Sequence, residues 1–225
     1  MKKTFLITSL LALALCLSCK RNFPPVIEKL IPWMGNGVWV QADALSQPSS
    51  EAISRTGFAD LLAQFAPSAG EAAQEAVPQI WLYARDSSAA ATADAVQAGA
   101  FFAVQGEFVR EVIFTVSAAG LRRPVFAGEI AAIAPGTEVT IELNYEPLPS
   151  RPVDEVLLFA VSESGLRKLA GRAPAPGRIE FSEKITIPKD GITLCAGGRR
   201  QTAEGPAQWF YTNTIKILSK PRPKS

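Results

Sequence analysis

The chain has 225 residues, of which 48% are hydrophobic, with 23 basic and 21 acidic side chains. This apolar content excludes wholesale disorder and is enough for one large or two small domains with a core. The near balance of charge excludes a broad positive field for nucleic acid. The complete absence of histidine excludes Ser-His-Asp and Cys-His catalysis, HExxH metalloproteases and zinc sites built on imidazole.

Residues 1–18 have the pattern of an export signal. Lys2 and Lys3 are followed by an uncharged stretch rich in Leu and Ala that ends at small residues and cysteine. The apolar run 5–17 has 13 residues, which is too short for a membrane span of about 20 residues. Loss of Lys2 and Lys3 with the signal would leave 21 basic residues against 21 acidic ones, a formal net charge of zero.

The end of this signal, Leu15-Cys16-Leu17-Ser18-Cys19, resembles the lipobox of bacterial lipoproteins, in the loose form familiar among spirochaete lipoproteins. The resemblance covers about the first 20 residues and departs from the family where Cys16 replaces the usual Leu. It implies cleavage before Cys19, acylation of Cys19 (a palmitate-type anchor) and a place in the cell envelope. Lys20, which is not a retention-type Asp, favours the outer membrane. The alternative is an ordinary secretory signal that leaves Cys19 free.

Residues 19–37 would begin with the lipidated N-terminus that the resemblance implies. Their many prolines and glycines predict an irregular tether or extended arm. Residues 38–98 are predicted to form a small mixed segment. It would hold short strands at 38–40 and 80–83 and a helix around Phe58 to Phe65, where apolar residues fall at helical spacing. Residues 87–98 are predicted to form either a flexible loop or a weak helix.

Residues 99–219 are predicted to be all-β, with a basic tail at 220–225. Alternation of apolar and polar residues, as in 139–143, is typical of an antiparallel sheet with one wet face. The expected strands are Phe101–Gln105, Phe108–Ser117, Pro124–Ile133, Glu138–Tyr145, Glu155–Ser162, Arg178–Ile187, Ile192–Cys195 and Trp209–Leu218. Together they predict a mainly β fold, an antiparallel β-sandwich of Ig-like architecture without the Cys…Trp…Cys pattern of a true Ig domain, preceded by a small N-terminal helical segment.

Two arginine pairs are candidates for binding an anion or a partner. Arg199 and Arg200 follow two glycines that could shape a backbone nest, and the alternative is a charged turn between strands. Arg122 and Arg123 raise the same two possibilities. Cys195 lies in an apolar strand, so it is predicted to be a small buried hydrophobe, with an exposed thiol as the alternative.

No catalytic pattern emerges from the acids. Glu107 and Glu111 lie four residues apart on a predicted strand, as do Glu138 and Glu142, so each pair would be about 13 Å apart. That exceeds the separation of a glycosidase pair. Core packing is the expected role of the tryptophans, and the alternative is that Trp33 and Trp39, close to the anchor, lie at a membrane interface.

We therefore expect a non-enzymatic, membrane-anchored lipoprotein whose β-sandwich serves as a binding or adhesion module, with no cofactor and no metal. Its partner would be an envelope or host protein or a glycan. One alternative is an envelope assembly or structural factor that lends an edge strand to a partner. The least favoured is a histidine-free hydrolase that uses carboxylates brought together by folding.

Overall fold

The computed structural model describes residues 24–32, 36–41, 79–162, 165–174, 180–203, 205 and 207–220. The predicted signal peptide, Cys19, Trp33, the helix around Phe58 and the basic tail beyond residue 220 lie outside these residues. Within them no helix is long and apolar enough to cross a bilayer.

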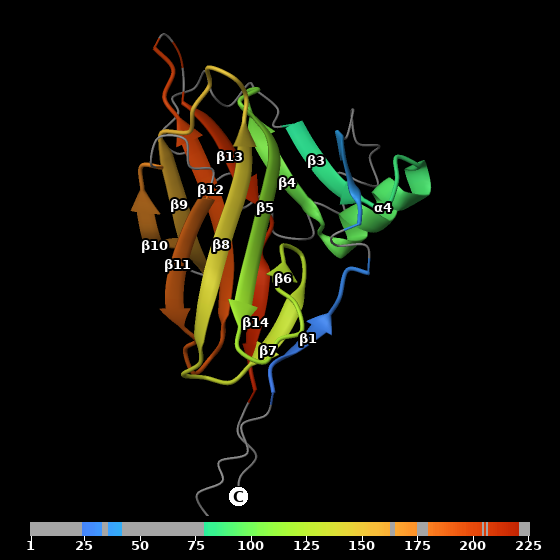
Figure 1. Cartoon of the computed structure of the whole chain (residues 1–225), viewed down its shortest axis with the longest axis vertical. Coiled ribbons are helices and arrows are strands. Elements are labelled where there is room, and N and C mark those ends of the chain that lie inside the picture. The colour runs from blue at the N-terminus through green and yellow to red at the C-terminus, as the bar shows by residue number, and fades with distance from the viewer. Residues whose placement is uncertain are drawn as a thin grey trace, which may run out of the picture.

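The chain folds into a β-sandwich of two sheets (Figure 1). The smaller sheet has the order β11-β8-β5-β6, with antiparallel pairing throughout. Its strands are β5 (Val109–Ala118), β6 (Val125–Phe126), β8 (Glu138–Pro147) and β11 (Glu180–Thr186). The long β8 pairs with β5 on one side and with β11 on the other, as its alternation predicted.

The larger sheet has ten strands, with the order β1-β7-β14-β12-β13-β4-β3-β2 and with β9 and β10 attached beside β12. The strands are β1 (Val26–Lys29), β2 (Val38–Gln41), β3 (Gln79–Ala84), β4 (Phe101–Gln105), β7 (Ile130–Ile133), β9 (Glu155–Ser162), β10 (Gly165–Arg172), β12 (Ile192–Arg200), β13 (Gln208–Thr212) and β14 (Ile215–Ser219). All of its pairs are antiparallel except β14 with β7.

This larger sheet forks at β12. One side of β12 pairs with β9 over residues 193–199. On its other side the first half of β12 pairs with β14 and the second half pairs with β13. The two branches therefore diverge at residues 213 and 214, where one expected strand, Trp209–Leu218, is broken in two.

The predictions from sequence agree with these strands to different degrees. The bounds expected for β4 and β9 are confirmed, and the mainly β fold is confirmed as a whole. The single strand expected over 124–133 is wrong, because a turn at Ala127 and Gly128 separates β6 from β7. The strand expected at 192–195 continues to Arg200, and β10 was not predicted. Residues 26–29 of the expected tether form β1, which pairs with β7.

Residues 87–98 were expected to form either a flexible loop or a weak helix, and the structure has the helix α4 (Ala89–Ala98) there. Ser88 caps its start, since its hydroxyl accepts a hydrogen bond from Ala91 N at 3.2 Å. Gly99 ends it in the left-handed conformation at φ 80°. The boundary expected between residues 98 and 99 lies just after this helix, and β3 before it pairs with β4 after it. The larger sheet is thus continuous across that boundary.

Two apolar clusters hold the fold together. The first lies between the two sheets, and its largest buried side chains include Phe102, Phe108, Phe114 and Phe210. The second lies on the other face of the larger sheet, where α4 contributes Ala91, Ala95 and Val96. Both faces of the larger sheet are therefore apolar near β3, β4 and β12. The sequence had predicted an antiparallel sheet with one solvated face.

Candidate functional site

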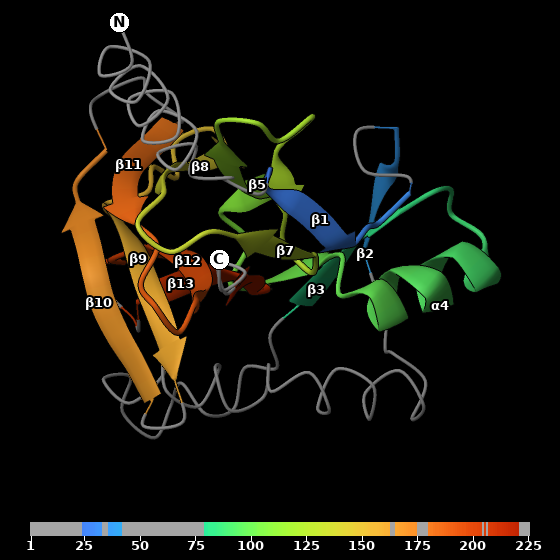
Figure 2. The ribbon, with the colours of Figure 1, turned by 90° about the horizontal axis from the view of Figure 1, so that it is seen from below.

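The beginning of β1 and the end of β14 lie at the same end of the molecule. Val26 pairs with Ala132 of β7, and Ala132 pairs with Leu218 of β14. Lys220 Nζ lies 3.9 Å from Glu28 Oε1 across the two strands. Figure 2 looks onto this end and shows β1 crossing it. We call it the terminal end, because residues 19–23 and 221–225 connect to the body here.

A groove runs beside β1 at the terminal end, and we call it the β1 groove. Its volume is about 690 Å³. It is formed by Pro24, Pro25, Val26, Ile27, Leu30, Gly120, Leu121, Arg122 and Arg123. Val26 and Leu30 are the most exposed of its large apolar side chains, at 42% and 53%. The surface is thus apolar along β1 and basic along the loop between β5 and β6.

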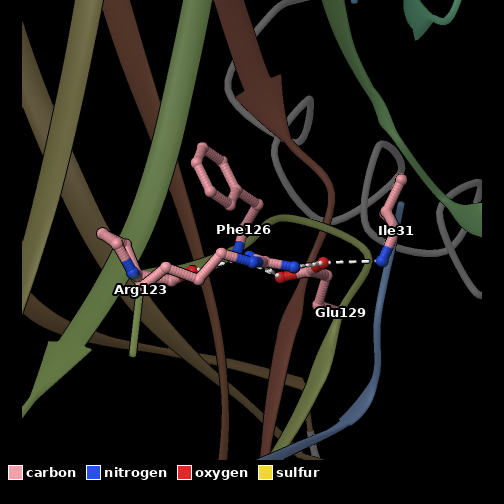
Figure 3. Close-up of polar contacts among 5 residues, drawn as sticks. Ile31, Arg123, Phe126 and Glu129 are labelled. Atoms are coloured by element: carbon pink, nitrogen blue, oxygen red, sulfur yellow. Dashed lines mark hydrogen bonds and ion pairs between the residues drawn. The ribbon is translucent and has the colours of Figure 1, made fainter. Parts of the chain in front are cut away.

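The two arginines of that loop have different roles. Arg122 is exposed, whereas Arg123 turns inward to the carboxylate of Glu129 (Figure 3). Its two terminal nitrogens donate to the two carboxylate oxygens at 2.8 and 2.6 Å. Its guanidinium also lies 5.5 Å from the centre of the Phe126 ring. The charged turn predicted for this pair therefore describes Arg122, whereas Arg123 is a structural partner of Glu129.

Glu129 is a buried acidic residue of the kind found at functional sites, and the sequence pattern did not single it out. Its side chain is completely buried. Besides Arg123, it accepts hydrogen bonds from Ile31 N at 2.7 Å and from Phe126 N at 2.9 Å (Figure 3). Four donors thus occupy both oxygens, as a buried carboxylate requires. This arrangement ties the end of β1 to the β6–β7 turn and leaves the carboxylate no position for a substrate proton.

Arg199 and Arg200 lie within β12 rather than in a turn or a nest. Packing explains the glycine at position 198 of β12, because a Cβ there would come within 2.2 Å of the Phe210 ring. Arg199 lies 5.7 Å from the centre of the Trp209 ring, with Nε 4.0 Å from Glu155 Oε2. Arg200 donates to Gln208 Oε1 at 2.8 Å. Both guanidinium groups are half-buried and packed against their own sheet, remote from the β1 groove.

A small apolar pocket opens between the two sheets near β2. Trp39 packs edge-on against Tyr83 and Phe102, with ring centres 5.0 and 4.8 Å apart. Phe114 and Phe126 complete the wall. The pocket volume is about 70 Å³, well below the roughly 300 Å³ of a typical small-molecule site. Trp39 is therefore a packing residue of the sandwich, as its alternative reading predicted, and the pocket is too small for a sizeable ligand.

The remaining candidate residues include Cys195 and Glu138. Cys195 is fully buried, which confirms its prediction as a small hydrophobe. Burial raises the pKa of its thiol to about 12. Glu138 forms an exposed ion pair with Lys184 at 2.8 Å. Within the described part of the chain, no three His, Cys, Asp or Glu side chains gather as metal ligands.

No family model matches the chain, and no curated protein matches it significantly.

Proposed function

We propose that the chain is a lipoprotein of the bacterial cell envelope, held on the outer membrane by acyl chains on Cys19. Its β-sandwich would act there as a non-enzymatic binding or adhesion module. One observation carries the proposal beyond the lipobox resemblance. The first described residue, Pro24, lies at the terminal end, only five positions after Cys19.

The short connection defines an orientation. Five residues span at most about 18 Å, even when fully extended. The terminal end, with β1 and its groove, would therefore be kept at the membrane. The loops at the opposite end would then face away from it, because β5 and β8 run between the two ends with ten residues each, about 33 Å. Those outward loops, at 106–108, 148–154 and 201–203, are where we expect an envelope or host partner to bind.

The saturated carboxylate of Glu129 supports the non-enzymatic proposal. A general acid or base must reach a substrate proton, and Glu129 already accepts four hydrogen bonds inside the body. It is the only acid among the buried polar residues of the described chain. A hydrolase would need carboxylates from elsewhere on the surface.

Incorporation of radiolabelled palmitate tests the anchor. The wild-type chain should take up label and partition into detergent, and Cys19→Ser should abolish both. Cys16→Ser is the matched control, because Cys16 would leave with the signal, and it should label like the wild type. Equal labelling of wild type and Cys19→Ser, or none in either, would contradict the proposal and indicate a secreted protein.

A second candidate, an envelope assembly factor, is favoured by one observation. β10 pairs only with β9 among the described strands, so its outer edge could accept a partner strand. Co-purification from gently solubilised membranes separates the two. A single stoichiometric envelope partner would favour assembly, whereas binding to host matrix or glycan by intact cells would favour adhesion.

A further inference from the structure

The β1 groove combines three properties, which are an apolar surface, a basic border and a position close to the proposed anchor. It is apolar, since Pro25, Val26, Leu30 and Leu121 contribute to its surface. Val26 and Leu30 are, with Val38, the exposed large hydrophobic residues of the described chain. Exposed apolar residues concentrated at one place mark an interaction surface.

The groove is also bordered by positive charge. Arg122 is exposed on the loop after β5. Lys220, directly after β14, is paired with Glu28, so these two charges offset each other. In the sequence, Lys20 and Arg21 fall between Cys19 and the first groove residue. Two acids beside the groove residues, Glu28 and Glu129, are already paired with Lys220 and Arg123. The unpaired charge next to the apolar strip is therefore basic.

The third property is position. The groove begins at Pro24, which is tied by roughly 18 Å of chain at most to the acylated cysteine of the proposed function. Any partner in the groove must therefore fit within that distance of the bilayer. An amphipathic surface with apolar and basic residues side by side is the kind that settles into the headgroup region.

We infer that the β1 groove seats on the lipid bilayer itself. Val26 and Leu30 enter the interface, and Arg122 contacts the phosphate of an anionic phospholipid headgroup. The inference rests on the proposed function for its geometry. It goes further, because it makes the folded body a second membrane contact that fixes the orientation of the sandwich. A tether alone would let the body rotate freely above the membrane.

Position-specific fluorescence tests the seating. Cys195 is completely buried and Cys19 is acylated in the proposed state, so maleimide should label neither in the wild type. Single fluorophores are attached at Val26→Cys and Leu30→Cys in the groove and at Glu107→Cys at the opposite end. The lipidated chains are reconstituted into vesicles that contain brominated phosphatidylcholine and phosphatidylglycerol. The groove fluorophores should be quenched at least about twofold more than the one at position 107, because interfacial apolar groups lie about 5–10 Å into the boundary. Equal quenching at all three positions would overturn the inference.

A second measurement removes the dependence on acylation. The Cys19→Ser chain, labelled at position 30, is tethered through an amino-terminal histidine tag to vesicles with nickel-chelating lipid. Quenching should increase when phosphatidylglycerol is added, and Arg122→Glu should weaken this seating equilibrium by about fivefold or more. Arg110→Glu is the matched control, because Arg110 is an exposed arginine near the other end of β5. Equal losses from both substitutions, or no response to phosphatidylglycerol, would overturn the role of Arg122.

The two arms separate failure of the groove from failure of the anchor. If maleimide labels Cys19 in the wild type while the tethered chain still seats on the vesicle, the proposed acyl anchor is wrong and the inference about the groove stands. If the wild type is acylated but the groove fluorophores are not selectively quenched, the proposed anchor stands and the inference about the groove is wrong. A dimer in detergent that Leu30→Glu disrupts would assign the groove to a second copy of this chain and overturn membrane seating.

Discussion

Arg123 and Glu129 form a two-point ion pair inside the body, with each terminal nitrogen of the guanidinium opposite one carboxylate oxygen at 2.8 and 2.6 Å. The glutamate side chain is fully buried, whereas 28% of the arginine side chain remains exposed. The pair closes the β5–β6 loop onto the β6–β7 turn, and Ile31 N adds β1 to the same carboxylate. One acidic side chain thus joins three segments beside the last residues of β1.

Removal of Glu129 should therefore destabilise the fold strongly. Glu129→Ala leaves two backbone N–H groups without an acceptor and leaves the partly buried Arg123 guanidinium with only the Pro124 carbonyl. The expected loss is about 3–5 kcal/mol in the free energy of unfolding. Glu129→Gln keeps one acceptor oxygen but turns an amide N–H toward other donors, with an expected loss of roughly 2 kcal/mol or more. Urea denaturation of the signal-free chain measures both.

The control for this prediction is Glu138→Gln. Glu138 also pairs with a cation, Lys184, but both side chains are largely exposed. Water screens such pairs, so no measurable change in the unfolding midpoint is expected. If Glu129→Gln were as stable as the wild type, the carboxylate would not stabilise the contact between these segments as its hydrogen bonds indicate.

Gly128 should be irreplaceable for steric reasons beyond its φ of +90°. A Cβ there would lie 2.4 Å from Gly99 O and 2.6 Å from Gly99 C, both backbone atoms that cannot move aside. Gly128→Ala is expected to cost roughly 3 kcal/mol or more. Gly136→Ala is the matched control, since its φ is +80° and nothing lies within 4 Å of the added Cβ. It should show only the cost of a left-handed alanine, about 1–2 kcal/mol. Equal losses of stability in both variants would mean that backbone strain, and not steric contact, determines the cost of the added Cβ.

The sequence predicted the fold where a strand is defined by its own residues. Phe101–Gln105 and Glu155–Ser162 are compact apolar runs between turn signals, and their bounds agree with β4 and β9. β10 was missed because Arg167, Lys168 and two glycines dilute its apolar residues, and its pairing with β9 is the result of a hairpin rather than of burial.

The site residues were harder to predict because their partners are distant in sequence. Glu129 falls inside the strand expected over 124–133, and Ile31, one of its donors, lies 98 positions earlier. The β1 groove joins residues 24–30 to residues 120–123, a proximity that only the pairing of β1 with β7 creates. Arg122 and Arg123 could be singled out from sequence, but their opposite orientations depend on the buried carboxylate.

Thr212 should be essential at the fork of the larger sheet. Ala196 in β12 lies opposite the point where β13 ends, and the Thr212 hydroxyl takes the place of ladder bonds. It accepts from Ala196 N at 3.0 Å and donates to Ala196 O at 3.3 Å. Thr212→Val removes the hydroxyl from a buried position and should cost about 1–3 kcal/mol. Thr212→Ser keeps the hydroxyl and should retain most of the stability. A valine variant at least as stable as the serine variant would contradict this role.

Alkaline pH should destabilise the fold through groups that are buried in their neutral forms. Burial raises the pKa of Cys195 to about 12 and that of Tyr145 to about 12, and it also raises the pKa of Tyr211. In the unfolded chain the thiol titrates near 8.5 and the phenols near 10. Between about pH 9 and 12 the unfolded chain therefore binds fewer protons than the native one, and stability falls as pH rises.

Cys195→Ala isolates the contribution of the thiol to this decline. Above the unfolded pKa, one group kept protonated only in the native state lowers stability by about 1.4 kcal/mol per pH unit. The variant should lose some stability at neutral pH, because the removed sulfur leaves a small cavity. Its decline from about pH 9 to 11 should nevertheless be shallower than that of the wild type by up to that slope. Urea midpoints measured across this range give both slopes, and parallel declines would show that Cys195 ionises in the native state as readily as in the unfolded one.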